Sequence, residues 1–177
     1  LNDLLDLSSL EASKMVFDLV PCRFVPIIQE VLDIHSAQFR QKEMAATVDI
    51  PVDLEVVADR SRLSQIFRNL LSNAVKYSPE GSTVAIDAAR SPKDGTVDIT
   101  VTDRGYGIPK GELESIFDRF TQSSRTRTGA GGTGLGLAIC RELALAHGGR
   151  LWAENNPGGG TVFHLLLPLA GPPKEHP

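Results

Sequence analysis

The stretch RLSQIFRNLLSNAVKY, residues 62–77, has the spacing of an amphipathic helix with two distinct faces. At about 100° per residue, its apolar side chains gather on one side, as the buried face of a helix requires. A polar stripe lies roughly 120° away on the same helix. We therefore predict a helix over 61–77 with Asp59 or Ser61 as its N-cap. The apolar face comprises Leu63, Ile66, Phe67, Leu70, Leu71, Ala74 and Val75, and the polar stripe comprises Arg62, Asn69, Asn73 and Lys76.

The segments on either side of this helix predict β-hairpins and further helices. STVAIDAAR (82–90) and GTVDITVTD (95–103) alternate apolar and polar residues and are joined across PKDG, which is a strong hairpin signal. LWAEN and TVFHLLLP form a second such pair across NPGGG. This mixture predicts an α+β fold, a two-layer α/β sandwich with helices packed on one face of a mixed sheet. The other expected elements are strands in 15–20, 47–51 and 54–59, and helices over 24–44, 110–117 and 134–147.

The composition indicates a globular protein and argues against several function classes. With 18 Lys and Arg against 22 Asp and Glu, the net charge of −4 gives no support to nucleic-acid binding. The two cysteines are too few for a disulfide framework or a cysteine-built metal site, which favours a reducing, cytoplasmic setting. No apolar run approaches the ~20 residues of a membrane helix. We therefore expect no direct membrane contact by this part of the protein.

The polar stripe of the 61–77 helix suits a metal ion and a phosphate. Asn69 and Asn73 lie one turn apart, and Lys76 follows one turn later. Carboxamide oxygens are hard, neutral ligands that suit Mg²⁺, and a lysine ammonium is a point charge for phosphate. The alternative is that both asparagines face solvent or hydrogen-bond locally, as polar helix faces commonly do. Tyr77 taken alone indicates a core or interface position.

Two glycine-rich stretches follow, and each alone has a simpler explanation. DRGYGIP, residues 103–109, comes directly after a strand, so Asp103 is placed to accept a hydrogen bond from an exocyclic amine such as that of adenine. The alternative is a plain turn. GGTGLGL, residues 131–137, places unpaired N–H groups at a helix N-terminus, where anions bind. It matches neither the Walker pattern nor the dinucleotide fingerprint, and the alternative is a flexible loop.

Taken together, in this order and spacing, the motifs resemble the N, G1, F and G2 boxes of sensor histidine kinases. The closing GGRLWAENNPGGGTVFHLLLP resembles the last hairpin of that family, and the resemblance spans 14–168. It implies a catalytic domain of the GHKL superfamily with the Bergerat ATP-binding fold. The residues that carry it are Asn69, Asn73, Lys76 and Tyr77, then Asp103, Gly105, Gly107 and Ile108, then Phe117 and Phe120, then Gly132, Thr133, Gly134, Leu135, Gly136 and Leu137.

For the nucleoside, the resemblance implies a site around the first glycine motif. Asp103 would bind the adenine amine, with Thr161 helping through water. Gly105 and Gly107, with Ile108 beside them, would admit the purine. Tyr77 would line the nucleoside side.

For the phosphates, the resemblance implies Asn73 as a Mg²⁺ ligand, Asn69 as support for metal or phosphate, and Lys76 as a phosphate contact. Residues 118–133 would form an ATP lid, in which Arg125 and Arg127 are equal candidates for the γ-phosphate. Phe117 and Phe120 would anchor this lid by packing. The backbone N–H groups of Gly132, Thr133, Gly134, Leu135, Gly136 and Leu137 would meet the phosphates.

The resemblance also implies transfer of the ATP γ-phosphate to a histidine on a dimerisation domain, and from there to the receiver domain of a response regulator. Acceptor histidines of this family are usually followed by Glu or Asp. None of the four here fits, and each is better explained as a surface or packing histidine: His35, His147, His164 and His176. We therefore expect the acceptor elsewhere in a longer, homodimeric protein that is cytoplasmic or membrane-anchored. This part alone is not expected to autophosphorylate.

The expected domain organisation follows from the same resemblance. LNDLLDLSSLEASK resembles the end of the second dimerisation helix, so 1–13 are assigned to that helical hairpin. Residues 14–170 are assigned to the catalytic domain and 171–177 to a disordered tail.

Two other functions are compatible with parts of the pattern. ATP-hydrolysing proteins of this fold, such as DNA gyrase, use a glutamate on the asparagine helix to activate water. Here Asn69 occupies that position and 61–77 contains no Asp or Glu, which disfavours hydrolysis and, equally, the anti-sigma serine kinases. A degenerate module without kinase activity is the second alternative. The intact phosphate-facing positions argue against it.

Overall fold

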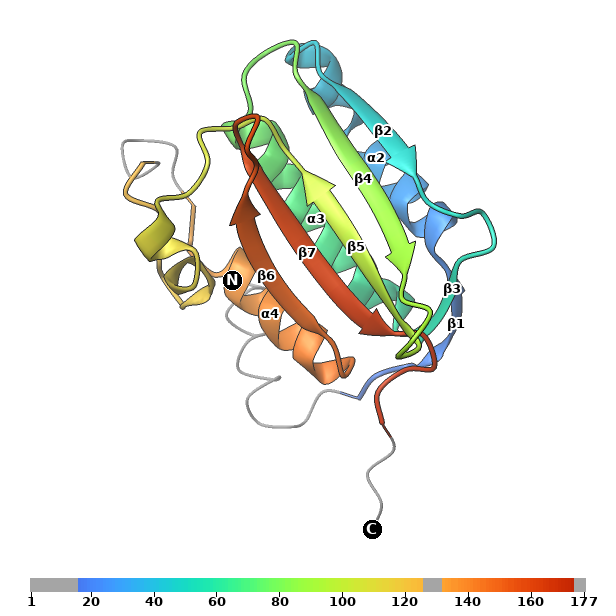
Figure 1. The fold of residues 1–177 in the computed structure, drawn as a ribbon. Coiled ribbons are helices and arrows are strands. Elements are labelled where there is room, and N and C mark those ends of the chain that lie inside the picture. The colour runs from blue at the N-terminus through green and yellow to red at the C-terminus, as the bar shows by residue number, and fades with distance from the viewer. Residues whose placement is uncertain (1–15, 126–131, 174–177) are drawn as a thin grey trace.

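The computed structural model describes residues 16–125 and 132–173, which form a mixed β-sheet with helices behind it (Figure 1). The five-stranded sheet has the order β2-β4-β5-β7-β6, with β2 parallel to β4 and the other neighbours antiparallel. Strands β1 and β3 form a separate antiparallel pair. The strands are β1 (Val20–Arg23), β2 (Ala45–Asp49), β3 (Glu55–Ala58), β4 (Thr83–Arg90), β5 (Thr96–Thr102), β6 (Arg150–Asn155) and β7 (Thr161–Pro168).

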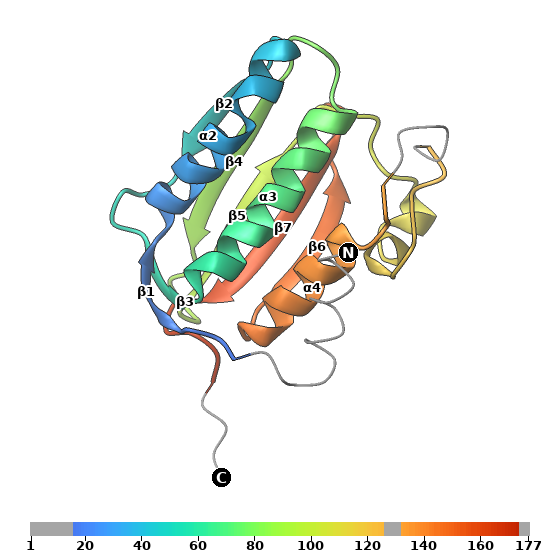
Figure 2. The same cartoon turned by 180° about the vertical axis from the view of Figure 1, so that it is seen from behind.

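Three α-helices of the described segments cover one face of the large sheet: α2 (Phe24–Gln41), α3 (Arg60–Tyr77) and α4 (Gly136–Ala146) (Figure 2). The predicted α+β sandwich, with helices on one side of a mixed sheet, is therefore confirmed. None of the helices in these described ranges is long and apolar enough to cross a membrane.

The core lies between these helices and the inner face of the sheet. Every residue of the predicted apolar face of α3 is buried, and Phe67 meets Phe24 of α2 edge to face, with ring centroids 5.7 Å apart. Alternate residues of β5 and β7, such as Ile99 and Leu165, are fully buried beneath the helices. The spacing of apolar residues therefore indicates which side of the helices and which face of the sheet are turned toward the core.

Several element boundaries differ from the predictions. The strand expected in 15–20 is wrong: β1 starts at Val20 and includes Pro21, which pairs with Val57 of β3. Pro21 is tolerated there because a two-stranded pair consists of edge strands, where a missing N–H need not break a ladder. The short helix expected near 110–117 is two 3₁₀ turns, η1 (Lys110–Glu112) and η2 (Ser115–Phe117). The N-cap of α3 is Asp59, whose carboxylate accepts from Arg62 N at 3.1 Å.

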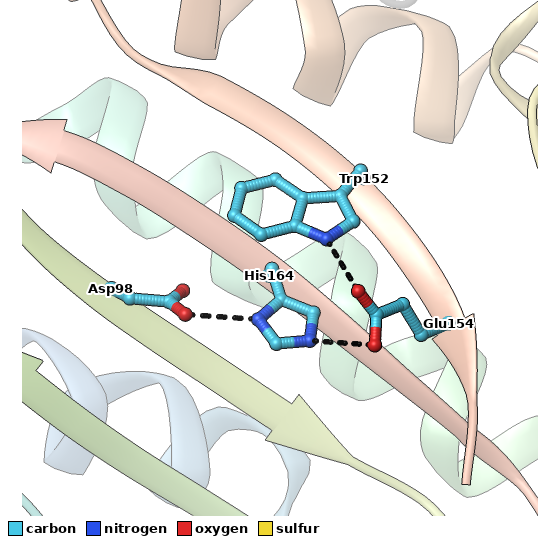
Figure 3. Close-up of polar contacts among 4 residues, drawn as sticks. All are labelled: Asp98, Trp152, Glu154 and His164. Atoms are coloured by element: carbon cyan, nitrogen blue, oxygen red, sulfur yellow. Dashed lines mark hydrogen bonds and ion pairs between the residues drawn. The ribbon is translucent and has the colours of Figure 1, made fainter.

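On the other face of the sheet, a small polar cluster surrounds His164 of β7 (Figure 3). Its Nδ1 lies 3.0 Å from Asp98 Oδ2 of β5, and its ring stacks on Trp152 of β6 at a centroid distance of 4.6 Å. The Trp152 indole N–H donates to Glu154. His164 is therefore a packing histidine on the face that the described helices leave open.

His147, just after α4, joins the end of that helix to the start of α3. The backbone N–H of Asp59 donates to His147 Nε2 at 3.1 Å, so His147 carries its proton on Nδ1, which donates to the Leu143 carbonyl at 2.7 Å. The segment before β1 adds two contacts to this connection between α4 and α3. Phe17 packs edge to face on the imidazole, and Asp18 N donates to the Asp59 carboxylate. Burial lowers the pKa of His147, and the bond to Leu143 and the charge of Asp59 oppose that shift.

We expect the free energy of unfolding to fall as the pH drops below about 6.5, the ordinary histidine pKa. Below that value the unfolded chain takes up a proton at His147, whereas the folded chain, with its lowered pKa, resists protonation. Above it both forms are neutral and this contribution vanishes. Urea unfolding of the wild type and His147→Gln between about pH 5 and pH 8 measures the effect. Equal slopes for wild type and His147→Gln would contradict the assignment.

Candidate functional site

A cavity of about 440 Å³ opens where α3, the loop after β5 and the start of α4 meet. It combines segments that lie up to 94 residues apart in the chain, from Asn69 to Phe163. Its wall contains most of the predicted site residues. These are Asn69, Asn73, Lys76, Tyr77, Asp103, Gly107, Ile108, Gly132, Thr133, Gly134, Gly136, Leu137 and Thr161.

Asn69, Asn73 and Lys76 of the polar stripe line this cavity rather than bulk solvent, whereas Arg62 donates to Gln65 and lies outside the wall. Asn69 is held in place, because its Nδ2 donates to the Gly136 carbonyl at 3.4 Å. Asn73 also lines the cavity, and its carboxamide has no hydrogen-bond partner within the described ranges. Lys76 Nζ lies 5.1 Å from the centroid of the Tyr77 ring. The stripe therefore presents one fixed carboxamide, one available carboxamide and one ammonium to the cavity.

Asp103 is the acidic residue among the described residues of the cavity wall and is only 5% exposed. Its Oδ1 accepts from the backbone N–H groups of Gly105 at 2.8 Å and Thr161 at 3.0 Å. Burial raises the pKa of the Asp103 carboxyl, and these two hydrogen bonds oppose the shift. Because both bonds go to Oδ1, the second oxygen remains for a donor on a ligand. The two hydrogen bonds thus fix the orientation of the carboxylate and offset part of the free-energy cost of its desolvation.

The two glycines after Asp103 have different neighbours. A Cβ on Gly105 would lie 2.9 Å from the Tyr77 carbonyl, so this glycine lets the loop approach the end of α3, and it does not line the cavity. Gly107 lines the cavity with φ +68°. Asn155 of β6 clamps the next residue: its Oδ1 accepts from Ile108 N at 2.8 Å and its Nδ2 donates to Ile108 O at 2.6 Å.

The start of α4 offers backbone N–H groups to the cavity. The helix begins at Gly136, and no side chain caps this end within the described residues. Gly136 and Leu137 lie in the cavity wall, where the positive end of the helix dipole favours an anion. Leu135 instead is 2% exposed and belongs to the core. Gly134, at φ +69°, is required by the protein itself, because a Cβ there would lie 2.7 Å from the Phe120 carbonyl carbon.

The segment leading into the expected lid is only partly as predicted. Phe117 is buried and meets Phe163 edge to face at 6.5 Å, which confirms its packing role. The packing role of Phe120 is wrong: the residue is 68% exposed. With φ +59° its side chain turns outward while its backbone N–H donates to the Gly134 carbonyl at 2.9 Å. Arg125 donates to the Tyr106 carbonyl at 2.6 Å, and Arg127 lies outside the described residues.

Sequence patterns did not single out several residues of the site. Ile116 and Phe163 are apolar and fit the core, so nothing in their spacing separates a cavity wall from a core position. Asn155 ends a strand, and its clamp on Ile108 joins positions 47 residues apart. The remaining residues of the wall that were missed are Ser72, Tyr106, Thr121, Gln122 and Ser123.

Gly160 is expected to be the least replaceable glycine beside this site. At φ +94°, an added Cβ would overlap the Asp103 carbonyl oxygen and lie 2.6 Å from its carbon, displacing the segment that orients the carboxylate. Gly159 has nearly the same φ, +91°, with nothing within 4 Å of its Cβ position. Gly160→Ala should therefore lower the free energy of unfolding by about 2 kcal/mol more than Gly159→Ala does. If urea unfolding gave equal losses of stability for Gly160→Ala and Gly159→Ala, the requirement for glycine at 160 would come from backbone strain alone and not from the close approach to Asp103.

The fold is a helix-covered mixed sheet, and its cavity combines a buried carboxylate, a stripe of carboxamides and lysine, and an uncapped helix start. This combination is that of an ATP-binding sandwich. The chain belongs to the family of histidine kinase-, DNA gyrase B- and HSP90-like ATPases, which matches residues 58–171, and its relatives are sensor histidine kinases of that family.

Known proteins resemble this chain over most of its length. The sensor-like histidine kinase SenX3 of Mycolicibacterium smegmatis is 37% identical over 99% of this chain and 46% of its own length. The mycobacterial sensor histidine kinase MprB structure shares 32% identity with a TM-score of 0.75, covering 88% of this chain and 100% of that one. Full-length ShkA, in complex with AMPPNP, has a TM-score of 0.81 at 29% identity over 98% of this chain and 36% of its own. This chain thus spans less than half the length of SenX3.

Proposed function

We propose that this chain is the Mg²⁺–ATP-binding catalytic domain of a two-component sensor histidine kinase. The observation that carries the proposal is the convergence of Asn73, Lys76, Asp103 and the start of α4 on one cavity. Each group suits a different part of ATP. The AMPPNP complex of the similar protein ShkA supports a nucleotide of this kind.

At the nucleoside end, Asp103 would accept a hydrogen bond from the adenine amine. Its fixed Oδ1 and remaining Oδ2 make it an oriented acceptor, and adenine carries an exocyclic donor where guanine carries a carbonyl. Thr161 is positioned beside the same carboxylate and would support a bridging water. Tyr77, Gly107 and Ile108 complete this part of the wall.

At the phosphate end, the residues fit a Mg²⁺ ion bound together with the nucleotide. No group of three acidic, histidine or cysteine ligands exists in the described segments, so a metal held by protein alone is not supported. A neutral Asn73 oxygen fits an ion whose charge the phosphates balance, which is how Mg²⁺ usually binds nucleotides. Asn69 would hold this arrangement against α4, while Lys76 and the amides of Gly136 and Leu137 contact phosphate. When bound, Mg²⁺ would neutralise charge on the phosphates during transfer.

The wall favours transfer over hydrolysis. Asp103 is the acidic side chain in the described part of the wall, and α3 carries neither Asp nor Glu to activate water. The carboxylate at the start of α3, Asp59, is already bonded to two backbone N–H groups.

The acceptor histidine would come from another domain. Among the described histidines, His35 and His147 are buried and bonded to backbone carbonyls, and His164 lies in the cluster with Asp98. We infer that the acceptor belongs to a dimerisation domain of the same homodimeric protein, and that a response regulator receives the phosphate. Residues 14–170 would be the catalytic domain and 1–13 would lead from the dimerisation helices, in a protein whose kinase part is cytoplasmic. Residues 1–15 and 174–177 lie outside the described ranges.

Calorimetry with Mg²⁺–ATP, followed by incubation with radiolabelled ATP and the dimerisation domain of the parent protein, tests the proposal. We expect binding below millimolar ATP and label on a histidine of the dimerisation domain. Absence of binding at millimolar ATP would overturn the nucleotide assignment. Binding without any transfer would instead support the degenerate-module alternative.

A further inference from the structure

Tyr106 is a large aromatic residue that lines the cavity and yet is 71% exposed. A residue with both properties lies at the opening of the cavity. Leaving an aromatic ring in water forgoes the favourable burial that such side chains usually obtain. Tyr77, the other tyrosine in the wall, is by contrast half-buried.

The backbone on both sides of Tyr106 is tightly held. Before it, Gly105 N donates to Asp103 Oδ1 at 2.8 Å; after it, Ile108 makes two hydrogen bonds with the Asn155 carboxamide. The Tyr106 carbonyl itself accepts from Arg125 Nη1 at 2.6 Å. The exposed position of Tyr106 is therefore imposed by the loop and does not result from a loose segment.

Apolar side chains contribute part of the cavity wall. Ile108, Ile116 and Phe163 line the cavity as nearly buried members of the core. A planar base resting on that surface next to Asp103 would leave its opposite face to solvent unless a residue at the opening covers it. Tyr106 is the aromatic residue placed at that opening.

We propose that the Tyr106 ring packs on the nucleoside of the bound nucleotide, and that Arg125 is the positioning residue that holds it there. This inference rests on the proposed function, because it names a contact within the same nucleotide site. It also assigns Arg125 a role other than the expected γ-phosphate contact, since its guanidinium donates to the loop carbonyl.

Replacing Tyr106 by alanine should raise the Kd for Mg²⁺–ATP by about 5- to 100-fold, the range that base–aromatic stacking supports. Tyr106→Phe, which keeps the ring, should stay within about twofold of the wild type. Phe120→Ala is the matched control, since Phe120 is similarly exposed on a neighbouring segment but does not line the cavity. Binding of Mg²⁺–tripolyphosphate, which has no nucleoside, should be the same in wild type and Tyr106→Ala.

The outcomes separate this inference from the function on which it rests. If the wild type binds no ATP, the proposed function fails and the Tyr106 contact fails with it. If the wild type binds ATP and Tyr106→Ala binds it equally well, only the Tyr106 contact is overturned. An equal loss of tripolyphosphate affinity would also overturn it, since the substitution would then act on the phosphate end.

The role of Arg125 has its own readout. A residue that positions Tyr106 should affect every adenine nucleotide alike, so Arg125→Ala should weaken ATP and ADP by the same factor. Arg125→Lys, which retains a donor for the carbonyl, should recover part of the loss, and Arg125→Ala should add little in the Tyr106→Ala background. Loss of ATP affinity alone, with ADP unchanged, would assign Arg125 to the γ-phosphate and overturn the positioning role.

Discussion

Asn73→Ala should abolish the magnesium-dependent part of ATP binding, with a loss of affinity of about 10- to 100-fold. Asn73 offers a neutral oxygen to the cavity, and its carboxamide has no competing hydrogen-bond partner in the described segments. Removing it leaves the ion with phosphate and water alone on that side. Calorimetric titration of ATP with Mg²⁺ and with EDTA measures the difference between the two conditions.

Gln38→Ala is the matched control for this substitution, because it removes an exposed carboxamide from α2 without touching the cavity. It should bind Mg²⁺–ATP as the wild type does. Asn73→Ala should also bind ATP in EDTA about as weakly as the wild type in EDTA. If the Mg²⁺ dependence of Asn73→Ala equalled that of the wild type, the metal assignment would be wrong.

Asp103→Asn should lower ATP affinity by about 100-fold while leaving the fold intact. Asparagine keeps an Oδ1 that can accept from Gly105 N and Thr161 N, so the loop geometry is retained. It replaces the second carboxylate oxygen by an NH₂ donor, which would face the amine donor of adenine. Loss of a hydrogen bond to a charged group and a donor–donor conflict together justify this magnitude. The wild type should prefer ATP to GTP, and equal affinity for both would contradict the role of Asp103.

The same substitution should not destabilise the protein without nucleotide. Since the folded-state pKa of Asp103 is raised by burial, the unfolded chain ionises first as the pH rises above about 3.8, so this group lowers stability at neutral pH. Asparagine does not ionise, so Asp103→Asn should unfold at an equal or higher urea concentration at pH 7. A clear loss of stability there would show that the carboxylate is structural, and would separate a folding defect from a binding defect.

The sequence predicted α3 well because its information is local. Apolar residues three and four apart must share one side of a helix, so Leu63, Ile66 and Phe67 had to enter the core together. The polar stripe was fixed by the same geometry, and its proposed use rests on the resemblance that the glycine motifs complete. The hairpins β4–β5 and β6–β7 were equally local, since a short turn joins each pair.

Where the predictions failed, the structure was determined by contacts between residues that lie far apart in the chain. Phe120 was assigned to packing because it is aromatic, yet the backbone of Gly134, which lies 14 positions later, holds it in a left-handed conformation that exposes its ring. Asn155 is an ordinary strand-end asparagine by sequence, and becomes the clamp of Ile108 only because β6 ends beside that loop.

The sequence by itself determined the sandwich and the residues that face its core, because helix and strand periods fix which side chains share a face. The groups proposed for Mg²⁺–ATP came from the resemblance that its motifs carry. The tertiary structure alone decided which of these groups share a cavity, which glycines serve the protein's own backbone, and that Arg125 donates to the Tyr106 carbonyl. Those outcomes depend on distances between segments many residues apart, and a linear spacing carries no such distance until the core has packed.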